Sequence, residues 1–184
     1  VEMQQRQLDK PLWMSEWTEM QEGRDAGMES ALLMAATIHD DLTITNVTSW
    51  QYWIAVSKYH YRDGLIYVDP LDHDVLPTKR LWVLGNYARF ISPDYVRLET
   101  QGGSETLLVS AYRAADDQRW VLVAANLANE PVNLQLEAVN GLLPMQVEQF
   151  ETSEQSDLVA LRAGLAQDTW TVAPLSVATL VLNR

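Results

Sequence analysis

The sequence contains no cysteine and few basic residues. Without cysteine, a disulfide framework and a thiolate metal site are both excluded, and the redox compartment stays open. The 13 Lys and Arg residues stand against 25 Asp and Glu residues, which gives a formal net charge of −12. Because this charge repels phosphate backbones and anionic membrane surfaces, we expect neither nucleic acid nor a membrane as a partner.

Long hydrophobic runs and several catalytic motifs are also missing. The longest apolar runs, such as residues 31–38, are too short to span a bilayer. No Gly-x-Ser-x-Gly elbow, phosphate-binding loop or His-Glu-x-x-His motif occurs, so serine hydrolase, nucleotide-binding and zinc-protease functions find no support, and we expect no cofactor. Its 184 residues are 47% hydrophobic, which is enough for a packed core in one domain or two small ones.

The first half of the sequence alternates strands with helices. Residues 11–17 are predicted to form a short buried strand, and residues 25–40 a helix with apolar side chains at helical spacing. Residues 46–56 are β-branched and aromatic without a polar stripe, which is typical of a strand covered on both faces. A polar, tyrosine-rich loop follows, and then a helix over residues 78–91. The order predicts two βα units.

From residue 95 onward the pattern is all-β. Eight short, β-rich segments are separated by turn residues at the spacing of a β-sandwich. They cover residues 95–99, 106–113, 120–126, 132–136, 145–150, 158–161, 169–172 and 178–182. The predicted fold class is therefore α/β plus all-β, with a first domain over residues 1–94 and an antiparallel β-sandwich over residues 95–184.

Two parallel βα units do not make a complete sheet. Their strands leave backbone groups unpaired and half of a core exposed. We therefore expect a missing part of the polypeptide, or another copy of the chain, to complete the first domain.

One carboxylate stands out in the first strand. Residues 12–17 read LWMSEW, so Glu16 lies at the end of a short apolar strand between tryptophans suited to stacking on a sugar ring. A retaining glycosidase needs two carboxyl groups about 5 to 5.5 Å apart, and no convincing second one is found in this sequence. Glu16 as the ordinary polar end of a strand is the alternative, and Glu19 and Glu22 are expected to be solvated surface charges.

Several blocks resemble the C-terminal part of glycoside hydrolase family 30, whose enzymes join a (β/α)8 barrel to a side β-sandwich. They are LWMSEW (12–17), SWQYWIAV (49–56), KRLWVLGNYARFISP (79–93), VSAYR (109–113), WVLVAAN (120–126) and VAPLSVATL (172–180). The resemblance implies that residues 1–94 are the last two βα units of that barrel. It also implies that Glu16 is the nucleophile on strand seven, and that the acid/base glutamate on strand four would precede Val1.

Three tryptophans are candidates for substrate binding. Trp50 and Trp53 are three positions apart, so in a strand they face opposite sides and only one points into a barrel. We favour Trp53, because the resemblance puts the second tryptophan near the sugar-binding floor, and Trp17 is a third candidate for stacking. The alternative is that Trp50 and Trp53 are both core residues.

The loop over residues 57–64 follows the second strand and is expected to rim the cleft. Tyr59, His60 and Tyr61 could donate hydrogen bonds to substrate hydroxyls, although a solvated loop with a turn at residues 63–64 is equally compatible with the sequence. Residues 69–74 hold three aspartates and His73, but without the spacing of a calcium loop we expect a surface loop and no metal site. His39 is interpreted as a helix C-terminal dipole partner.

The resemblance implies a retaining β-glycosidase that hydrolyses a neutral β-linked polysaccharide and is secreted or periplasmic. In appearance the sequence is most similar to bacterial endo-β-1,6-galactanases, while β-1,6-glucanase or xylanase specificity stays open. The competing hypothesis is a non-catalytic carbohydrate-binding or packing module, which should tolerate Glu16→Gln. A third is an oligomer whose copies complete one another's barrels.

Overall fold

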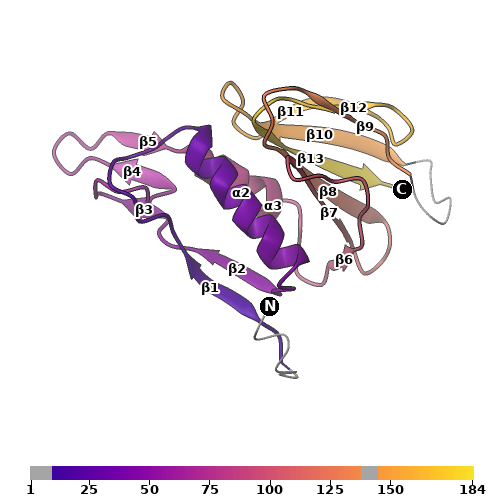
Figure 1. Ribbon diagram of the computed structural model, residues 1–184, viewed down its shortest axis with the longest axis horizontal. Coiled ribbons are helices and arrows are strands. Elements are labelled where there is room, and N and C mark those ends of the chain that lie inside the picture. Colours follow the sequence, from indigo (N-terminus) through magenta and orange to yellow (C-terminus); the bar gives the residue numbers. More distant parts are fainter. Residues whose placement is uncertain (1–9, 138–144) are drawn as a thin grey trace. The chain divides into compact units, whose positions relative to one another are not determined.

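The structure is a computed structural model that describes residues 10–137 and 145–184 (Figure 1). The chain divides into two compact units, residues 1–81 and 82–184, and we describe each unit by itself. The proposed domain boundary after residue 94 stays a prediction. The helices of the described chain lack the length and the hydrophobicity that a transmembrane span requires.

The first unit begins with a strand–helix–strand segment. Strands β1 (Trp13–Trp17) and β2 (Ser49–Tyr52) pair in parallel, and helix α2 (Met28–Thr43) connects them (Figure 1). The apolar face predicted for this helix is confirmed, because Ala31, Ala35 and Ile38 are at most 2% exposed. The helix runs three residues later than predicted at both ends.

The predicted strand over residues 46–56 is shorter in the structure. After β2 the chain turns, so that the Trp53 N–H donates to the Trp17 carbonyl and the Ile54 N–H donates to the Asp63 carbonyl. The prediction that this strand is covered on both faces is also wrong within the described chain, because Gln51 and Trp53 are exposed. The reason is that β1 and β2 form a sheet of two strands.

The tyrosine-rich segment predicted as a loop contains a small sheet. Strands β3 (Val56–Ser57), β4 (Ile66–Val68) and β5 (Val75–Pro77) are hydrogen-bonded in that order. The β3–β4 pair is parallel and the β4–β5 pair is an antiparallel hairpin. Helix α3 (Lys79–Ala88) follows and ends three residues before the predicted helix end.

The second unit contains two β-sheets, in agreement with the all-β pattern predicted from residue 95 onward. A six-stranded antiparallel sheet has the order β11-β10-β13-β8-β7-β6, and β12 pairs with β9 in a second sheet. The strands are β6 (Val96–Leu98), β7 (Leu107–Arg113), β8 (Arg119–Asn126), β9 (Val132–Leu134), β10 (Gln146–Thr152), β11 (Val159–Leu165), β12 (Trp170–Val172) and β13 (Ser176–Asn183). Trp170 of β12 shares a core with Val147 and Leu180 of the larger sheet. All eight predicted β segments are confirmed.

Candidate active site

Glu16 lies in an irregular part of β1. Met14 pairs with Trp50 and Trp17 with Tyr52, so three residue steps on β1 match two on β2. The extra residue makes a β-bulge at Ser15 and Glu16, and such bulges re-aim side chains and are frequent beside active sites. Glu16 is exposed, and among the described residues none pairs with or donates to its carboxylate. The carboxylate is therefore accessible to a ligand.

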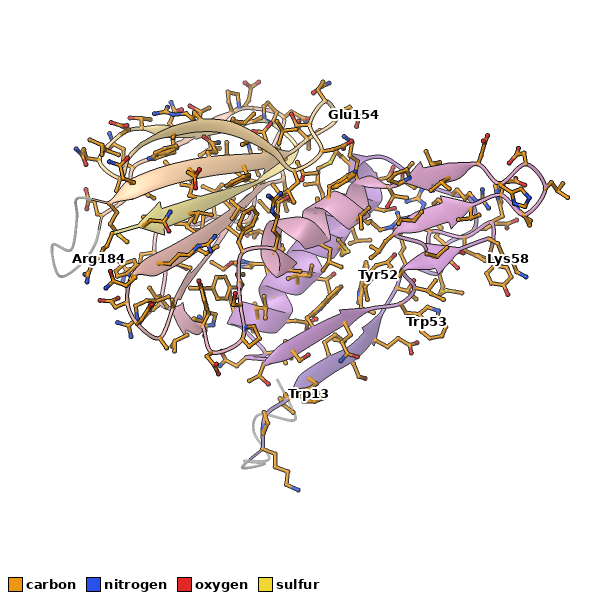
Figure 2. The ribbon with its side chains drawn as sticks, turned by 180° about the vertical axis from the view of Figure 1, so that it is seen from behind. Trp13, Tyr52, Trp53, Lys58, Glu154 and Arg184 are labelled. Carbon is orange, nitrogen blue, oxygen red and sulfur yellow. The ribbon has the colours of Figure 1, made fainter. Side chains whose placement is uncertain are left out.

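The aromatic side chains around the end of β2 divide into a packed group and an exposed one. The Trp17 ring centroid lies 5.8 Å from that of Trp50 and 6.0 Å from that of Tyr52. The Trp50 indole Nε1–H donates to Asp41 Oδ2 of α2 at 2.9 Å, so its one donor is occupied. Trp53 is 49% exposed (Figure 2). This arrangement favours Trp53 over Trp50 as the stacking surface.

Tyr52 is half-buried, and its hydroxyl oxygen is the buried end of the side chain. Burial raises the pKa of the Tyr52 phenol, even though Arg80 acts in the opposite direction. The phenol is therefore neutral near pH 7 and can act as a hydrogen-bond donor.

The segment that follows β1 is paired with the segment that carries Tyr59 and His60. The Gly23 N–H donates to the His60 carbonyl and the Arg62 N–H to the Gln21 carbonyl, both at 2.9 Å. The side chains of Tyr59 and His60 are exposed. The structure thus joins the chain that follows Glu16 to the chain predicted to contact substrate hydroxyls.

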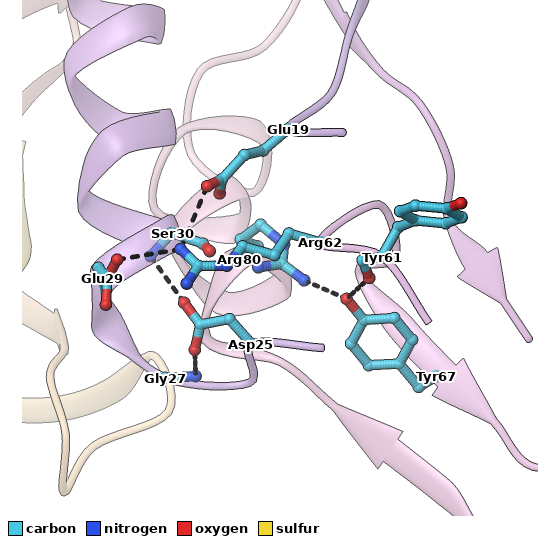
Figure 3. A network of polar contacts seen from close by, with 9 residues as sticks. All are labelled: Glu19, Asp25, Gly27, Glu29, Ser30, Tyr61, Arg62, Tyr67 and Arg80. Carbon is cyan, nitrogen blue, oxygen red and sulfur yellow. Dashed lines mark hydrogen bonds and ion pairs between the residues drawn. The ribbon is translucent and has the colours of Figure 1, made fainter. Parts of the chain in front are cut away.

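Arg62 links three parts of the first unit (Figure 3). Its Nη1 lies 3.2 Å from Glu19 Oε1 and 3.0 Å from Glu29 Oε1 of α2. The prediction that Glu19 is a solvated charge is therefore wrong, because its side chain is 13% exposed and pairs with Arg62. Glu22 is exposed, as predicted. No sequence pattern points to this ion pair, since its partners are 43 residues apart.

Two further arginines in this region contact Tyr67, which is completely buried. The Arg24 guanidinium carbon lies 4.8 Å from the Tyr67 ring centroid, and Arg80 Nη2 donates to the Tyr67 hydroxyl at 2.9 Å. The hydroxyl donates in turn to the Tyr61 carbonyl (Figure 3). Arg24, Arg62 and Arg80 were not among the functional candidates from the sequence, since the contacts that they make join residues far apart in the chain.

The aspartate cluster of residues 69–74 is a hairpin turn between β4 and β5. Asp69 Oδ1 accepts from the Leu71 N–H and Asp72 Oδ1 from the Asp74 N–H, which is how aspartates stabilise turns. These residues form a surface turn, as predicted. Within residues 10–137 and 145–184, no group of three His, Cys, Asp or Glu side chains is arranged to hold a metal ion. His39 lies one turn before the end of α2.

Comparison with known proteins connects this site to a family. Residues 13–67, which include β1, β2 and the segment carrying Tyr59 and His60, match the model of O-glycosyl hydrolase family 30. The chain is related to the glycoside hydrolases of this family. Glucuronoxylanase XynC from Bacillus subtilis (strain 168) is 27% identical over 187 residues, which cover 98% of this chain and 41% of that protein.

Solved structures share the fold. The catalytic domain of the family 30 xylanase C from Talaromyces cellulolyticus has a TM-score of 0.83 at 21% identity and matches 97% of this chain. A conserved exported protein from Bacteroides fragilis has a TM-score of 0.80 at 25% identity and matches 98%. The chain spans 42% and 40% of these two chains, so it corresponds to less than half of each relative.

Proposed function

We propose that this chain is the C-terminal part of a retaining β-glycosidase and that Glu16 is its nucleophile. The observation that carries the proposal is the exposed Glu16 carboxylate, on a β-bulge at the end of β1, within the segment that matches family 30. A carboxylate at the carboxyl end of a barrel strand faces the cleft where such enzymes act. Trp53, Tyr59 and His60 would bind the sugar, with Trp17 and Trp50 as further candidates for stacking.

The proposed reaction takes two steps. The Glu16 carboxylate attacks the anomeric carbon and forms a glycosyl ester, while the leaving oxygen takes a proton from an acid. Water then cleaves the ester and regenerates the carboxylate. We assign the acid/base role to the part of the relatives that this chain does not span, because sequence reasoning found no second carboxylate here.

The proposed substrate is a neutral β-linked polysaccharide, and the proposed place of action is outside the cytoplasm. The relatives named as xylanases support a xylan backbone, and the exported relative supports secretion. The sequence resemblance to endo-β-1,6-galactanases makes galactan the specificity to test against it.

The experiment traps the glycosyl ester on the chain. The protein is incubated with 2,4-dinitrophenyl β-xylobioside and, separately, 2,4-dinitrophenyl β-galactoside, and is then examined by intact-mass spectrometry and peptide mapping. Because dinitrophenolate departs with little acid assistance, the nucleophile can be tested without its partner. We expect an adduct on Glu16 with one of the two sugars.

Two variants make the result specific. Glu16→Gln should form no adduct, whereas Glu22→Gln removes an exposed carboxylate of the following segment and should react like the unmodified protein. A protein that gives no adduct with either glycoside, and that binds xylan equally well with and without Glu16→Gln, would instead be a non-catalytic carbohydrate-binding module.

A further inference from the structure

We propose that Arg24 is a positioning residue of the candidate site, which holds the backbone that carries Tyr59 and His60. The inference rests on the proposed function, because it assigns a task to Arg24 within that site. Arg24 lies in the segment that follows Glu16 and β1, so the same residue connects the nucleophile strand to the proposed sugar-contacting side chains.

The contact is made by two nitrogen atoms of the Arg24 guanidinium. Arg24 Nε donates to the Tyr59 carbonyl and Nη2 to the Lys58 carbonyl, each at 2.9 Å. A guanidinium presents these donors in a fixed planar fork, and a lysine ammonium does not. The same guanidinium stacks on the buried Tyr67 ring, which restricts its own position.

The neighbouring carbonyls are held in the same way. The His60 carbonyl accepts from the Gly23 N–H, and the Tyr61 carbonyl accepts from the Tyr67 hydroxyl at 2.6 Å. Four successive carbonyls, from Lys58 to Tyr61, therefore bind donors that come from outside this segment. We call this arrangement the carbonyl clamp. It restricts the backbone at each of the four positions.

The clamp binds backbone carbonyls and leaves the side chains of residues 59–61 exposed. Tyr59 is 56% exposed and Tyr61 42% exposed, and His60 is exposed as well. Side chains on a restrained backbone bind a ligand at a lower cost in conformational entropy than side chains on a mobile loop. Arg24 itself donates to carbonyls, so its effect on sugar binding passes through the backbone and not through contact with the sugar.

The test compares Arg24→Lys and Arg24→Ala with a matched control, Arg162→Lys. Arg162 makes related contacts in the second unit, because it lies 4.4 Å from the Trp170 ring centroid, donates to the Thr169 carbonyl and pairs with Asp168. The first readout is independent of activity. With three histidines in the chain, the imidazole signals of His60 can be assigned by nuclear magnetic resonance with His60→Gln. We expect both Arg24 variants, and not Arg162→Lys, to shift and broaden these signals.

The second readout is the rate of adduct formation on Glu16 as a function of dinitrophenyl glycoside concentration. Arg24→Lys loses the charge-assisted bonds that hold the Lys58 and Tyr59 carbonyls, so ordering this backbone becomes part of the cost of binding the sugar. We expect the half-saturating concentration to rise about tenfold. The maximal rate should change less than about twofold, since the Glu16 carboxylate is untouched. Arg24→Ala should raise the half-saturating concentration more than Arg24→Lys does, because lysine keeps the positive charge.

The outcomes separate this inference from the proposed function. Unchanged His60 signals in both Arg24 variants, or equal shifts in Arg162→Lys, would overturn the positioning role. If the unmodified protein forms no adduct while the His60 signals move only in the Arg24 variants, the clamp is supported and the proposed glycosidase function is what fails.

Discussion

In the second unit, three buried polar residues supply one another with hydrogen-bond partners. Asn86 Nδ2 donates to Thr179 Oγ1 at 2.9 Å, and the same hydroxyl donates to the Asn86 carbonyl at 2.7 Å. Thr152 Oγ1 donates to Asn86 Oδ1. All three residues are completely buried. Loss of one partner would therefore leave a polar group unpaired in the interior, which is costly.

At the residue scale we predict that Thr179→Val destabilises the protein. Valine has nearly the same shape but leaves Asn86 Nδ2 without its acceptor, so the free energy of unfolding should fall by about 1–3 kcal/mol in urea titrations. Thr171→Val is the matched control, because the Thr171 hydroxyl also bonds an asparagine, Asn133, but is exposed. Its effect should stay within about 0.5 kcal/mol. Equal losses for both variants would contradict the importance of burial.

At the scale of the element, the carboxylate of Asp25 determines where α2 begins. Asp25 Oδ1 accepts from the Gly27 N–H at 2.7 Å and Oδ2 from the Ser30 N–H at 2.9 Å. Burial acts to raise the pKa of Asp25, but the bonds from Ser30 and Gly27, with Arg80 nearby, hold it below its ordinary value. The helix accordingly begins at Met28, beyond the predicted start at Asp25.

We predict a pH-dependent loss of stability for Asp25→Asn. The carboxylate has a lower pKa in the folded chain than in the unfolded chain, so its contribution is present above the unfolded value of 3.8 and is lost as pH falls through the folded value. At pH 7 the variant should lose about 1 kcal/mol, typical of a helix cap. The difference from the unmodified protein should shrink below pH 3.8 in urea titrations followed by circular dichroism.

The control is Glu22→Gln, which removes an equal charge from an exposed side chain of the same segment. It should leave the free energy of unfolding at pH 7 within about 0.5 kcal/mol of the unmodified value. A loss for Asp25→Asn that stays constant as the pH falls would show that the charge of Asp25 plays no part in stabilising α2.

At the scale of the whole molecule, the two units differ in how their strands are supported. In the second unit, β13 lies between β10 and β8 and is almost entirely buried. In the first unit, β1 pairs with β2 alone among the described strands, and Trp13 is 65% exposed. Strands with one partner and exposed faces open more readily than central, buried strands.

Native-state hydrogen exchange should reveal this difference. We predict that the amides of β13 and β8 exchange slowest, and that those of β1 and β2 exchange at least about tenfold faster after correction for intrinsic rates. The unfolded chain in denaturant provides the reference. Equal protection of β1 and β13 would mean that the two-stranded sheet is completed in solution, for example by another copy of the chain.

The sequence by itself determined the local elements of this protein. The eight β segments and the buried face of α2 were predicted correctly, because side-chain periodicity is read within ten or so neighbouring residues. The family resemblance was also available from the sequence, through contiguous blocks around β1, β2 and α3. Element ends were less predictable. The helix α2 begins at Met28 because Asp25 accepts from the Gly27 and Ser30 N–H groups, and side-chain periodicity does not encode these bonds.

Only the tertiary structure decided which distant residues meet. The pairing of Glu19 with Arg62 and the hold of Arg24 on the Tyr59 carbonyl join residues that are 43 and 35 positions apart. The sheet of β3, β4 and β5 was predicted as a loop for the same reason, because backbone pairing depends on where the chain returns. Hydrogen bonds and ion pairs need their atoms within about 3 Å, and folding rather than local sequence brings these atoms together.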